Sequence, residues 1–195
     1  MKSPEEIKEV LKPLSGCGLY HWVAGDAITS FFLGRNISDL HVYFTSGKER
    51  LLAEGYLFSK GYKVIKRNNL GCKMRKANSI IDVLFSKKTP EETLYKFDYT
   101  VFCAAIDSEG KFYCHERFFE DMEDKNLYYT GNHQSIGAYS FKSKSNNLQR
   151  FINKGFGIKD EKNLLFWLKR LTLDQEQIKQ NKVPKIKQFK ILKMS

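Results

Sequence analysis

Three side chains that are able to hold a divalent cation lie on two apolar segments of the chain. Asp39 and His41 stand at the start of a predicted strand over 40–44, and Asp82 interrupts the apolar run 80–85. Side chains two residues apart on a strand face the same side, so Asp39 and His41 project together. Asp82 joins them if the two strands are neighbours, and a charge in so apolar a segment needs a partner or a metal. Such a cluster has the residue types that hold magnesium for phosphoryl transfer.

A glycine turn precedes this cluster in the sequence. Gly25 and Asp26 separate a predicted strand over 19–24 from a predicted helix over 26–33. Backbone amides at the N-terminus of a helix attract anions, and a glycine lets the backbone approach them closely. The turn is therefore a candidate cradle for a triphosphate.

The remaining hydrophobic pattern predicts the elements that position these groups. Strands are predicted over 19–24, 40–44, 62–67, 72–77, 80–85, 101–106 and 111–115, and helices over 3–12, 26–33, 48–60, 117–124, 146–154 and 160–180, with another helix beginning at 89. The turn Asn68-Asn69-Leu70-Gly71 joins two of the strands as a hairpin. This alternation predicts an α+β (α/β-like) fold, with a mixed sheet flanked by helices.

The composition indicates an ordered protein without a membrane span. Of the 195 residues 42% are hydrophobic and 14% aromatic, which excludes a disordered chain. No apolar run approaches the roughly 18 residues of a membrane span, and no secretory signal opens the chain, so a cytoplasmic protein is expected. The four cysteines are scattered without a Cys-x-x-Cys pair. This favours reduced, packed thiols over a zinc site at Cys114-His115.

Positive charge is concentrated at the C-terminal end. The chain has 33 Lys and Arg against 22 Asp and Glu, a net charge of +11, and residues 142–195 hold 14 of the basic and 4 of the acidic residues. We predict a head over 1–141 and a basic helical extension over 142–195 that binds a polyanion or is a solvated tail. Pro184 is predicted to open a short helix whose apolar stripe packs on its own domain, on nucleic acid or on a membrane surface.

A second group of cations lies in the predicted hairpin. No acidic residue occurs between Gly55 and Ile81. The basic residues of this stretch are Lys60, Lys63, Lys66, Arg67, Lys73, Arg75 and Lys76. Each cation that neutralises a phosphate releases condensed counterions, so the hairpin is a candidate guide for nucleic acid.

The order of these features resembles the nucleotidyltransferases of the polymerase-beta superfamily. The likeness is to the head of CCA-adding enzymes and bacterial poly(A) polymerases and to their small phage-encoded relatives, over about residues 19–158. That family has Gly-Gly-Ala, a helix ending in Leu-Gly-Arg, Asp-x-Asp on a strand and a third Asp on a later strand. The matching residues, in order, are Gly25, Ala27, Leu33, Gly34, Arg35, Asp39 and Asp82. The segment Phe97-Asp98-Tyr99-Thr100 looks like the family's Arg-Asp-Phe-Thr, which borders the nucleotide.

The resemblance implies transfer of a nucleoside monophosphate from an NTP to an acceptor hydroxyl, most simply an RNA 3′ end. It implies that Asp39 and Asp82 hold Mg²⁺ or Mn²⁺, and that Asp82 also helps to activate the acceptor. Gly25, Asp26 and Asp98 are expected beside the nucleotide. The expected RNA contacts are Lys63, Lys66, Arg67, Lys73, Arg75, Lys76, Arg150 and Lys154. A phage-encoded protein acting in the host cytoplasm is also implied.

Two residues depart from the family pattern at the chemistry itself. Asp26 stands in place of the second glycine, and His41 in place of the second aspartate. Imidazole is a poor substitute for a carboxylate that bridges two magnesium ions, and the loss predicts a rate about a thousandfold lower, with manganese as an alternative. Asp26 opposes anion binding by the turn, unless it points into the cleft and replaces the missing carboxylate. The rival hypothesis is a pseudoenzyme that keeps the fold and binds nucleic acid or a host protein.

Overall fold

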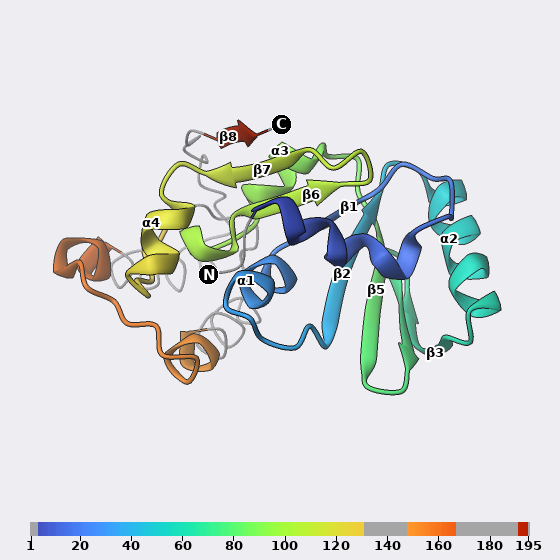
Figure 1. Cartoon of the computed structure of the whole chain (residues 1–195), viewed down its shortest axis with the longest axis horizontal. Coiled ribbons are helices and arrows are strands. Elements are labelled where there is room, and N and C mark those ends of the chain that lie inside the picture. Colours follow the sequence, from blue (N-terminus) through green and yellow to red (C-terminus); the bar gives the residue numbers. More distant parts are fainter. Residues whose placement is uncertain (1–3, 131–147, 167–190, 195) are drawn as a thin grey trace, which may run out of the picture. The chain divides into compact units, whose positions relative to one another are not determined.

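The computed structural model describes residues 4–130, 148–166 and 191–194 (Figure 1). The strands are β1 (Trp22–Ala24), β2 (Asp39–Phe44), β3 (Lys63–Asn68), β4 (Gly71–Lys76), β5 (Ser79–Phe85), β6 (Ala104–Asp107), β7 (Phe112–His115) and β8 (Ile191–Met194). The α-helices are α1 (Asp26–Phe32), α2 (Gly47–Ser59), α3 (Pro90–Leu94) and α4 (Phe118–Glu123), and the 3₁₀ helices are η1 (Pro4–Leu14) and η2 (Thr100–Phe102). Short helical segments also cover 148–152 and 161–166.

The strands form one mixed sheet in the order β3-β4-β5-β2-β1-β6-β7-β8. The central pair β2 and β5 is parallel, whereas β3–β4, β4–β5, β1–β2, β1–β6 and β6–β7 are antiparallel. Helices flank this sheet, so the predicted α+β fold with a mixed sheet is confirmed (Figure 1). No helix in the described ranges has an apolar stretch long enough to cross a membrane.

Contacts divide the chain into two compact units. The first contains Met1–Leu94, Ala104–Cys114 and Ile191–Ser195, and the second contains Tyr95–Cys103 and His115–Lys190. The predicted boundary between 141 and 142 lies outside the described residues.

In the first unit, alternation along the strands separates an apolar face from a polar one. Val42 and Phe44 of β2 and Val83 of β5 are at most 1% exposed, and α1 and α2 contact these central strands. The helices bury Ile28, Phe31, Ala53 and Leu57. Because successive strand residues point to opposite faces, the residues between these apolar ones lie on the other face of the sheet.

In the second unit, a buried carboxylate joins three elements. Asp121 of α4 is fully buried and accepts hydrogen bonds from Thr100 Oγ1 at 2.6 Å, Asn126 Nδ2 at 2.9 Å and an Arg117 guanidinium nitrogen at 3.0 Å. A buried carboxylate with all these donors holds η2, α4 and the following turn together.

Removal of this carboxylate is expected to be strongly destabilising. Asp121→Ala leaves donors of three residues without their acceptor, and breaking a buried ion pair in this way costs about 3–5 kcal/mol. Urea unfolding of Asp121→Ala beside Glu123→Ala, an exposed residue of the same helix, measures the cost. Equal stability of the two variants would show that the network does not hold the unit together.

Several predicted elements differ from the structure for local reasons. The predicted strand over 101–106 starts at Ala104, because Phe102 N and Cys103 N donate to Tyr99 O and Thr100 O and close a 3₁₀ turn. The predicted strand over 19–24 is shortened to Trp22–Ala24, and the Leu19 carbonyl before it accepts a hydrogen bond from His21 Nδ1. The N-terminal helix is present as the 3₁₀ helix η1.

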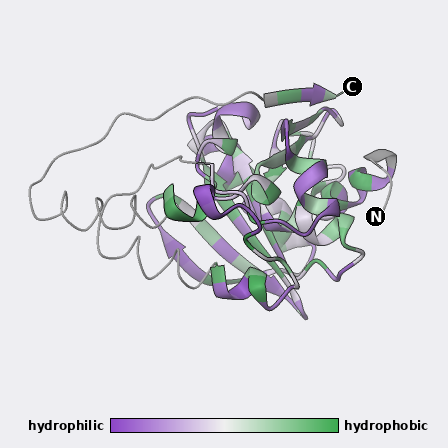
Figure 2. Ribbon diagram, turned by 90° about the vertical axis from the view of Figure 1, so that its left-hand side faces the viewer, coloured by the Kyte–Doolittle hydropathy of each residue, from purple (hydrophilic) through white to green (hydrophobic). Residues whose placement is uncertain are grey.

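The helix predicted from Pro184 is wrong at its C-terminal end. Residues Ile191–Met194 form β8, which lies beside β7 and is hydrophobic except for Lys193 (Figure 2). An edge position in the sheet satisfies the backbone of this short segment, and Lys193 Nζ lies 2.7 Å from a Glu91 carboxylate oxygen. The rest of the predicted tail helix, 184–190, lies outside the described residues.

Candidate metal centre

Strand register brings the candidate catalytic residues together in the first unit. His41 of β2 is the parallel partner of Asp82 on β5, and Lys73 of β4 is the antiparallel partner of the same aspartate. Paired residues project from the same face of a sheet, so the three side chains form a row across β2, β5 and β4. Asp39 stands two residues before His41 and joins this row.

The side chains of this row contact one another. His41 Nε2 lies 3.3 Å from Asp82 Oδ2, and Lys73 Nζ lies 2.9 Å from the same oxygen. Lys73 Nζ also lies 3.6 Å from Asp39 Oδ2. The Asp82 side chain is 15% exposed, whereas those of Asp39 and His41 are 42% and 41% exposed. The aspartate is therefore the enclosed member of an otherwise accessible cluster.

The charged forms of Asp82 and Lys73 stabilise each other. Burial alone raises the pKa of Asp82, but hydrogen bonds from His41 and Lys73 outweigh it and lower that pKa below its usual value. Burial likewise lowers the pKa of Lys73, and the two carboxylates outweigh it and raise that pKa. Beneath the cluster, burial and the negative charge of Asp82 raise the pKa of Tyr43. At neutral pH the site therefore contains an ammonium bound to carboxylates, over a neutral phenol.

The residues fit one divalent cation. One ligand atom from each of Asp39, His41 and Asp82 can be chosen so that all lie within 4.8 Å of one another. Asp39 Oδ1 is buried and has no hydrogen-bond partner among the described residues, and a bound cation would satisfy it. Two carboxylates and one imidazole suit Mn²⁺ better than Mg²⁺, because Mg²⁺ prefers a set of oxygen ligands.

Lys73 has a role that the sequence analysis missed. Its contact with nucleic acid stays a prediction, and the structure places its ammonium near both carboxylates that would hold a cation. The pairing of β4 with β5 puts Lys73 opposite Asp82. No sequence motif predicts this pairing.

The Gly25 turn lies near this end of β2. β1 and β2 are antiparallel, with Trp22 opposite Tyr43 and Val23 opposite Val42. Following β1 toward Gly25 therefore leads along β2 toward Asp39. Gly25 has φ of 87°, in the region that favours glycine, and its N–H donates to Ala104 O at 3.0 Å. That amide is used inside the sheet and is not a free donor for a phosphate. Asp26 begins α1 and is partly exposed.

Apart from Lys73, the basic residues of the β3–β4 hairpin fall into two groups. Arg67 pairs with Glu54 at 2.6 Å, and Lys76 Nζ donates to Lys60 O at 2.7 Å, so these two support the fold. Three others are exposed and have no ion pair in the described part of the chain. They are Lys63, Lys66 and Arg75. Their register with β4 puts them on the same face as Lys73, beside the cluster.

Three candidates from the sequence belong to the second unit. Asp98 accepts a backbone hydrogen bond from Thr130 N at 2.9 Å through its carbonyl. Arg150 and Lys154 lie over the ring of Phe151, at 5.3 and 4.6 Å from its centroid. The cation ligands belong to the first unit and these three residues to the second, so the roles of Asp98, Arg150 and Lys154 stay predictions.

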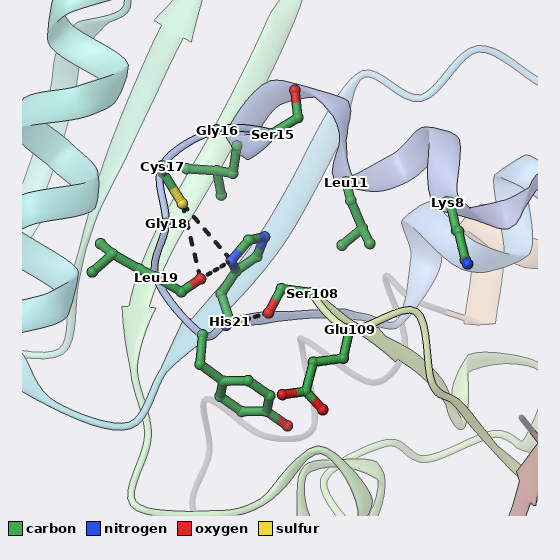
Figure 3. A pocket seen from close by; sticks show the side chains of 12 residues that line it. Lys8, Leu11, Ser15, Gly16, Cys17, Gly18, Leu19, His21, Ser108 and Glu109 are labelled. Atoms are coloured by element: carbon green, nitrogen blue, oxygen red, sulfur yellow. Dashed lines mark hydrogen bonds between the residues drawn. The ribbon is translucent and has the colours of Figure 1, made fainter.

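A separate hollow of about 480 Å³ lies where η1 meets the start of β1 (Figure 3). His21, which is 3% exposed, donates from Nδ1 to Leu19 O at 2.8 Å, and its buried Nε2 has no partner among the described residues. Cys17 Sγ lies 4.0 Å from His21 Nδ1. Because Nε2 is itself shielded from solvent, the imidazole acts as a structural group held neutral.

The neutral imidazoles predict a loss of stability in mild acid. Burial lowers the pKa of His21 and of His115 below 6.5, so the folded state binds fewer protons than the unfolded state. Stability is then complete above about pH 6.5 and falls as the pH drops toward the folded pKa values. His21→Gln, which does not titrate, is expected to lose less stability than the wild type between about pH 7.5 and 5.5 in urea unfolding. An equal loss in both proteins would contradict this.

Solved structures with a similar fold include CCA-adding enzymes and a tRNA-processing enzyme. A CCA-adding enzyme in complex with CTP matches with a TM-score of 0.61 and 16% identity, over 87% of this chain and 43% of the other. The Thermotoga maritima CCA-adding enzyme complexed with tRNA matches with a TM-score of 0.58 and 16% identity, over 81% and 40%. A tRNA-processing enzyme in an apo form matches with a TM-score of 0.51 and 18% identity, over 65% and 37%.

These matches establish a nucleotidyltransferase-like fold. The chain spans less than half the length of each of these enzymes. No curated protein matches the chain. At the level of sequence, the family described as Gabija anti-defense 2 family protein matches residues 6–125, which is more than half of the chain. The protein with this nucleotidyltransferase-like fold is therefore a member of the Gabija anti-defense 2 family.

Proposed function

We propose that this protein is a nucleotidyltransferase that counters the Gabija defence system by transferring a nucleoside monophosphate from an NTP to an acceptor hydroxyl, with RNA as the acceptor class. One observation carries the proposal: Asp39, His41 and Asp82 converge on adjacent strands of a nucleotidyltransferase-like fold, with ligand atoms within 4.8 Å. The family description supports the biological role. A phage-encoded protein working in the host cell is part of this proposal.

The proposed site works with one divalent cation. Asp39, His41 and Asp82 would hold that cation, which would supply Lewis-acid activation of the α-phosphate and charge stabilisation. In the metal-free protein, hydrogen bonds from His41 and Lys73 lower the pKa of Asp82, so its carboxylate is ionised and available to a cation. Lys73 contributes the positive charge that a second cation supplies in a two-ion site. The substitution of His41 for a carboxylate is in this way compensated by an ammonium on the neighbouring strand.

The acceptor and the triphosphate are proposed to lie along the basic side of this face. Lys63, Lys66 and Arg75 are exposed on the same face of the sheet as the cluster. Each contact between such a cation and a phosphate makes binding weaker as salt rises. Binding of a short single-stranded RNA is therefore expected to weaken steeply with added salt.

The donor set predicts a preference for manganese over magnesium. His41→Asp provides an oxygen ligand in place of nitrogen, and it is expected to raise the magnesium-supported rate at least about tenfold relative to the manganese-supported rate. Transfer rates with each cation, for the wild type and His41→Asp, measure this ratio. An unchanged ratio would show that His41 is not a ligand.

A second candidate function is favoured by the position of Lys73. Its ammonium lies 2.9 Å from Asp82 and 3.6 Å from Asp39, where it competes with a cation for the same oxygens. In a pseudoenzyme this lysine would replace the metal permanently, and the protein would counter Gabija by binding alone. The carboxylates would then serve the fold and not a reaction.

The two functions are distinguished in cells that carry the Gabija system. Cells expressing the wild type, the Asp39→Asn/Asp82→Asn double variant or no protein are infected with a phage that Gabija restricts, and plaques are counted. Catalysis predicts that the double variant no longer restores infection although it is expressed and folded, as judged by circular dichroism. Full restoration by the double variant would establish the pseudoenzyme, and no restoration by the wild type would overturn the role in counter-defence.

A further inference from the structure

The strand β3 forms one edge of the described sheet and is exposed along its whole length. Its six residues, Lys63–Asn68, pair with β4 on one side, and no described strand lies on the other. An exposed edge presents a row of backbone N–H and C=O groups to any extended chain. Natural edges are usually shortened, covered or twisted away, and this one is interrupted by a register shift between Val64 and Lys66.

Exposed apolar side chains occur on β3 and on α2. Val64 and Ile65 of β3 are each 46% exposed, and Leu51 and Phe58 of α2 are 53% and 69% exposed. We call these four side chains and the β3 backbone the edge surface. Large apolar side chains gathered at one place on a folded protein are typical of interaction sites.

An ion pair ties the helix to the strand within this surface. Arg67 of β3 reaches the buried Glu54 of α2, so both side chains lie on the helix-covered face of the sheet. Leu51 and Phe58 stand three residues before and four residues after Glu54, and such spacing puts them on the same side of the helix. Val64 is the register partner of the buried Met74 and therefore lies on that face as well.

The charge around the edge selects the partner. Seven basic residues and no acidic residue occur between Gly55 and Ile81. A second copy of this chain, pairing β3 with β3, would bring Lys63, Lys66 and Arg67 against their own kind, which is destabilising. Nucleic acid would use the cations but would leave Leu51, Phe58 and Val64 without an apolar contact.

We propose that the edge surface binds an extended acidic segment of a partner protein, which adds to the sheet as a strand beside β3. Backbone hydrogen bonds to β3 supply affinity, and alternate side chains of the segment give specificity. Acidic side chains face the basic hairpin, and apolar ones pack on Leu51, Phe58 and Val64. The surface uses none of the proposed cation ligands, so it operates whether or not the protein transfers nucleotides.

The test uses the full chain and a labelled synthetic peptide of alternating glutamate and valine. Fluorescence anisotropy measures its dissociation constant, and hydrogen exchange reports protection of the β3 amides. Matched probes are the same peptide with alternate backbone amides N-methylated, the peptide with lysine in place of glutamate, and a short single-stranded RNA. Matched protein variants are Leu51→Ser and Leu165→Ser, whose side chains are similarly exposed at 53% and 56%.

We expect the glutamate peptide to bind and to protect β3. It should bind at least about tenfold more weakly after N-methylation, which removes backbone hydrogen bonds, or in Leu51→Ser, which removes an apolar contact. Leu165→Ser and Asp82→Asn should leave the dissociation constant unchanged. Equal binding of the N-methylated peptide would exclude strand addition. Absence of peptide binding would overturn the proposal, as would peptide binding that Leu51→Ser leaves unchanged.

Discussion

Asp82→Asn is expected to lower nucleotide transfer by about a thousandfold or more, since a metal clamp is worth several kcal/mol and each 1.4 kcal/mol is tenfold. The substitution keeps the size of the side chain but removes the charge that His41 and Lys73 share. Asp82 is the enclosed member of the cluster, and a neutral amide does not supply the negative charge of the lost carboxylate. Cation affinity, measured by calorimetry, should fall together with the rate.

The control for this variant is Asp124→Asn. It makes the same chemical change at an exposed position at the end of α4, outside the candidate site. Its rate and cation affinity should equal those of the wild type. A wild-type rate in Asp82→Asn, with the loss confined to stability, would mean that Asp82 serves the fold and that any chemistry occurs elsewhere.

Lys73→Gln is expected to separate cation binding from catalysis. The variant removes a positive charge 2.9 Å from Asp82, so the cation should bind about tenfold more tightly because the repulsion is lost. The rate at saturating cation should nevertheless fall about a hundredfold, since a charged group that stabilises the transition state is worth that much. A lysine with a purely structural role would not produce this opposite movement of two measured quantities.

Lys48→Gln provides the matched control for Lys73→Gln. Lys48 is exposed on α2, and its removal should change neither the cation affinity nor the rate. If Lys73→Gln binds the cation more tightly and also gains activity, the lysine is an inhibitor of the site, as the pseudoenzyme requires. If neither quantity changes, Lys73 has no part in the site.

The fold could be predicted from the sequence where turn signals and alternation are strong. The turn 68–71 fixes the hairpin, and the apolar run 80–85 follows it too closely for anything except an adjacent strand. The strands predicted over 72–77 and 80–85 are β4 and β5, which begin and end within a residue or two of those bounds. Asp39, His41 and Asp82 are neighbours because β2 lies beside β5. The resemblance to nucleotidyltransferases implies this arrangement.

Prediction fails where tertiary contacts override the local pattern. The apolar positions 183, 186, 189 and 192 have the spacing of an amphipathic helix, whereas residues 191–194 form the strand β8 beside β7. The 3₁₀ turn at 100–102 is an apolar run in the sequence, and the hydrogen bonds that close it have no sequence signature. The role of Lys73 is hidden for a related reason, because it follows from cross-strand register.

Gly25 illustrates the difference between a motif and its use. The sequence predicts a turn, and the structure has one, with a positive φ. Its amide nevertheless donates to Ala104 O on β6, a strand about 80 residues later in the chain. Membership of a counter-defence family was likewise outside the reach of residue-level reasoning, since nothing in the cluster of carboxylates refers to a defence system.

Transfer of label from α-³²P-NTPs tests the central claim most directly. Purified wild type and the Asp39→Asn/Asp82→Asn variant are incubated with each of the four NTPs, a bulk RNA pool, and magnesium or manganese. The account predicts label in RNA with the wild type, more with manganese than with magnesium, and none with the variant. No label under any condition, from wild-type protein that binds RNA in a salt-sensitive manner, would contradict catalysis and leave the pseudoenzyme as the function of this fold.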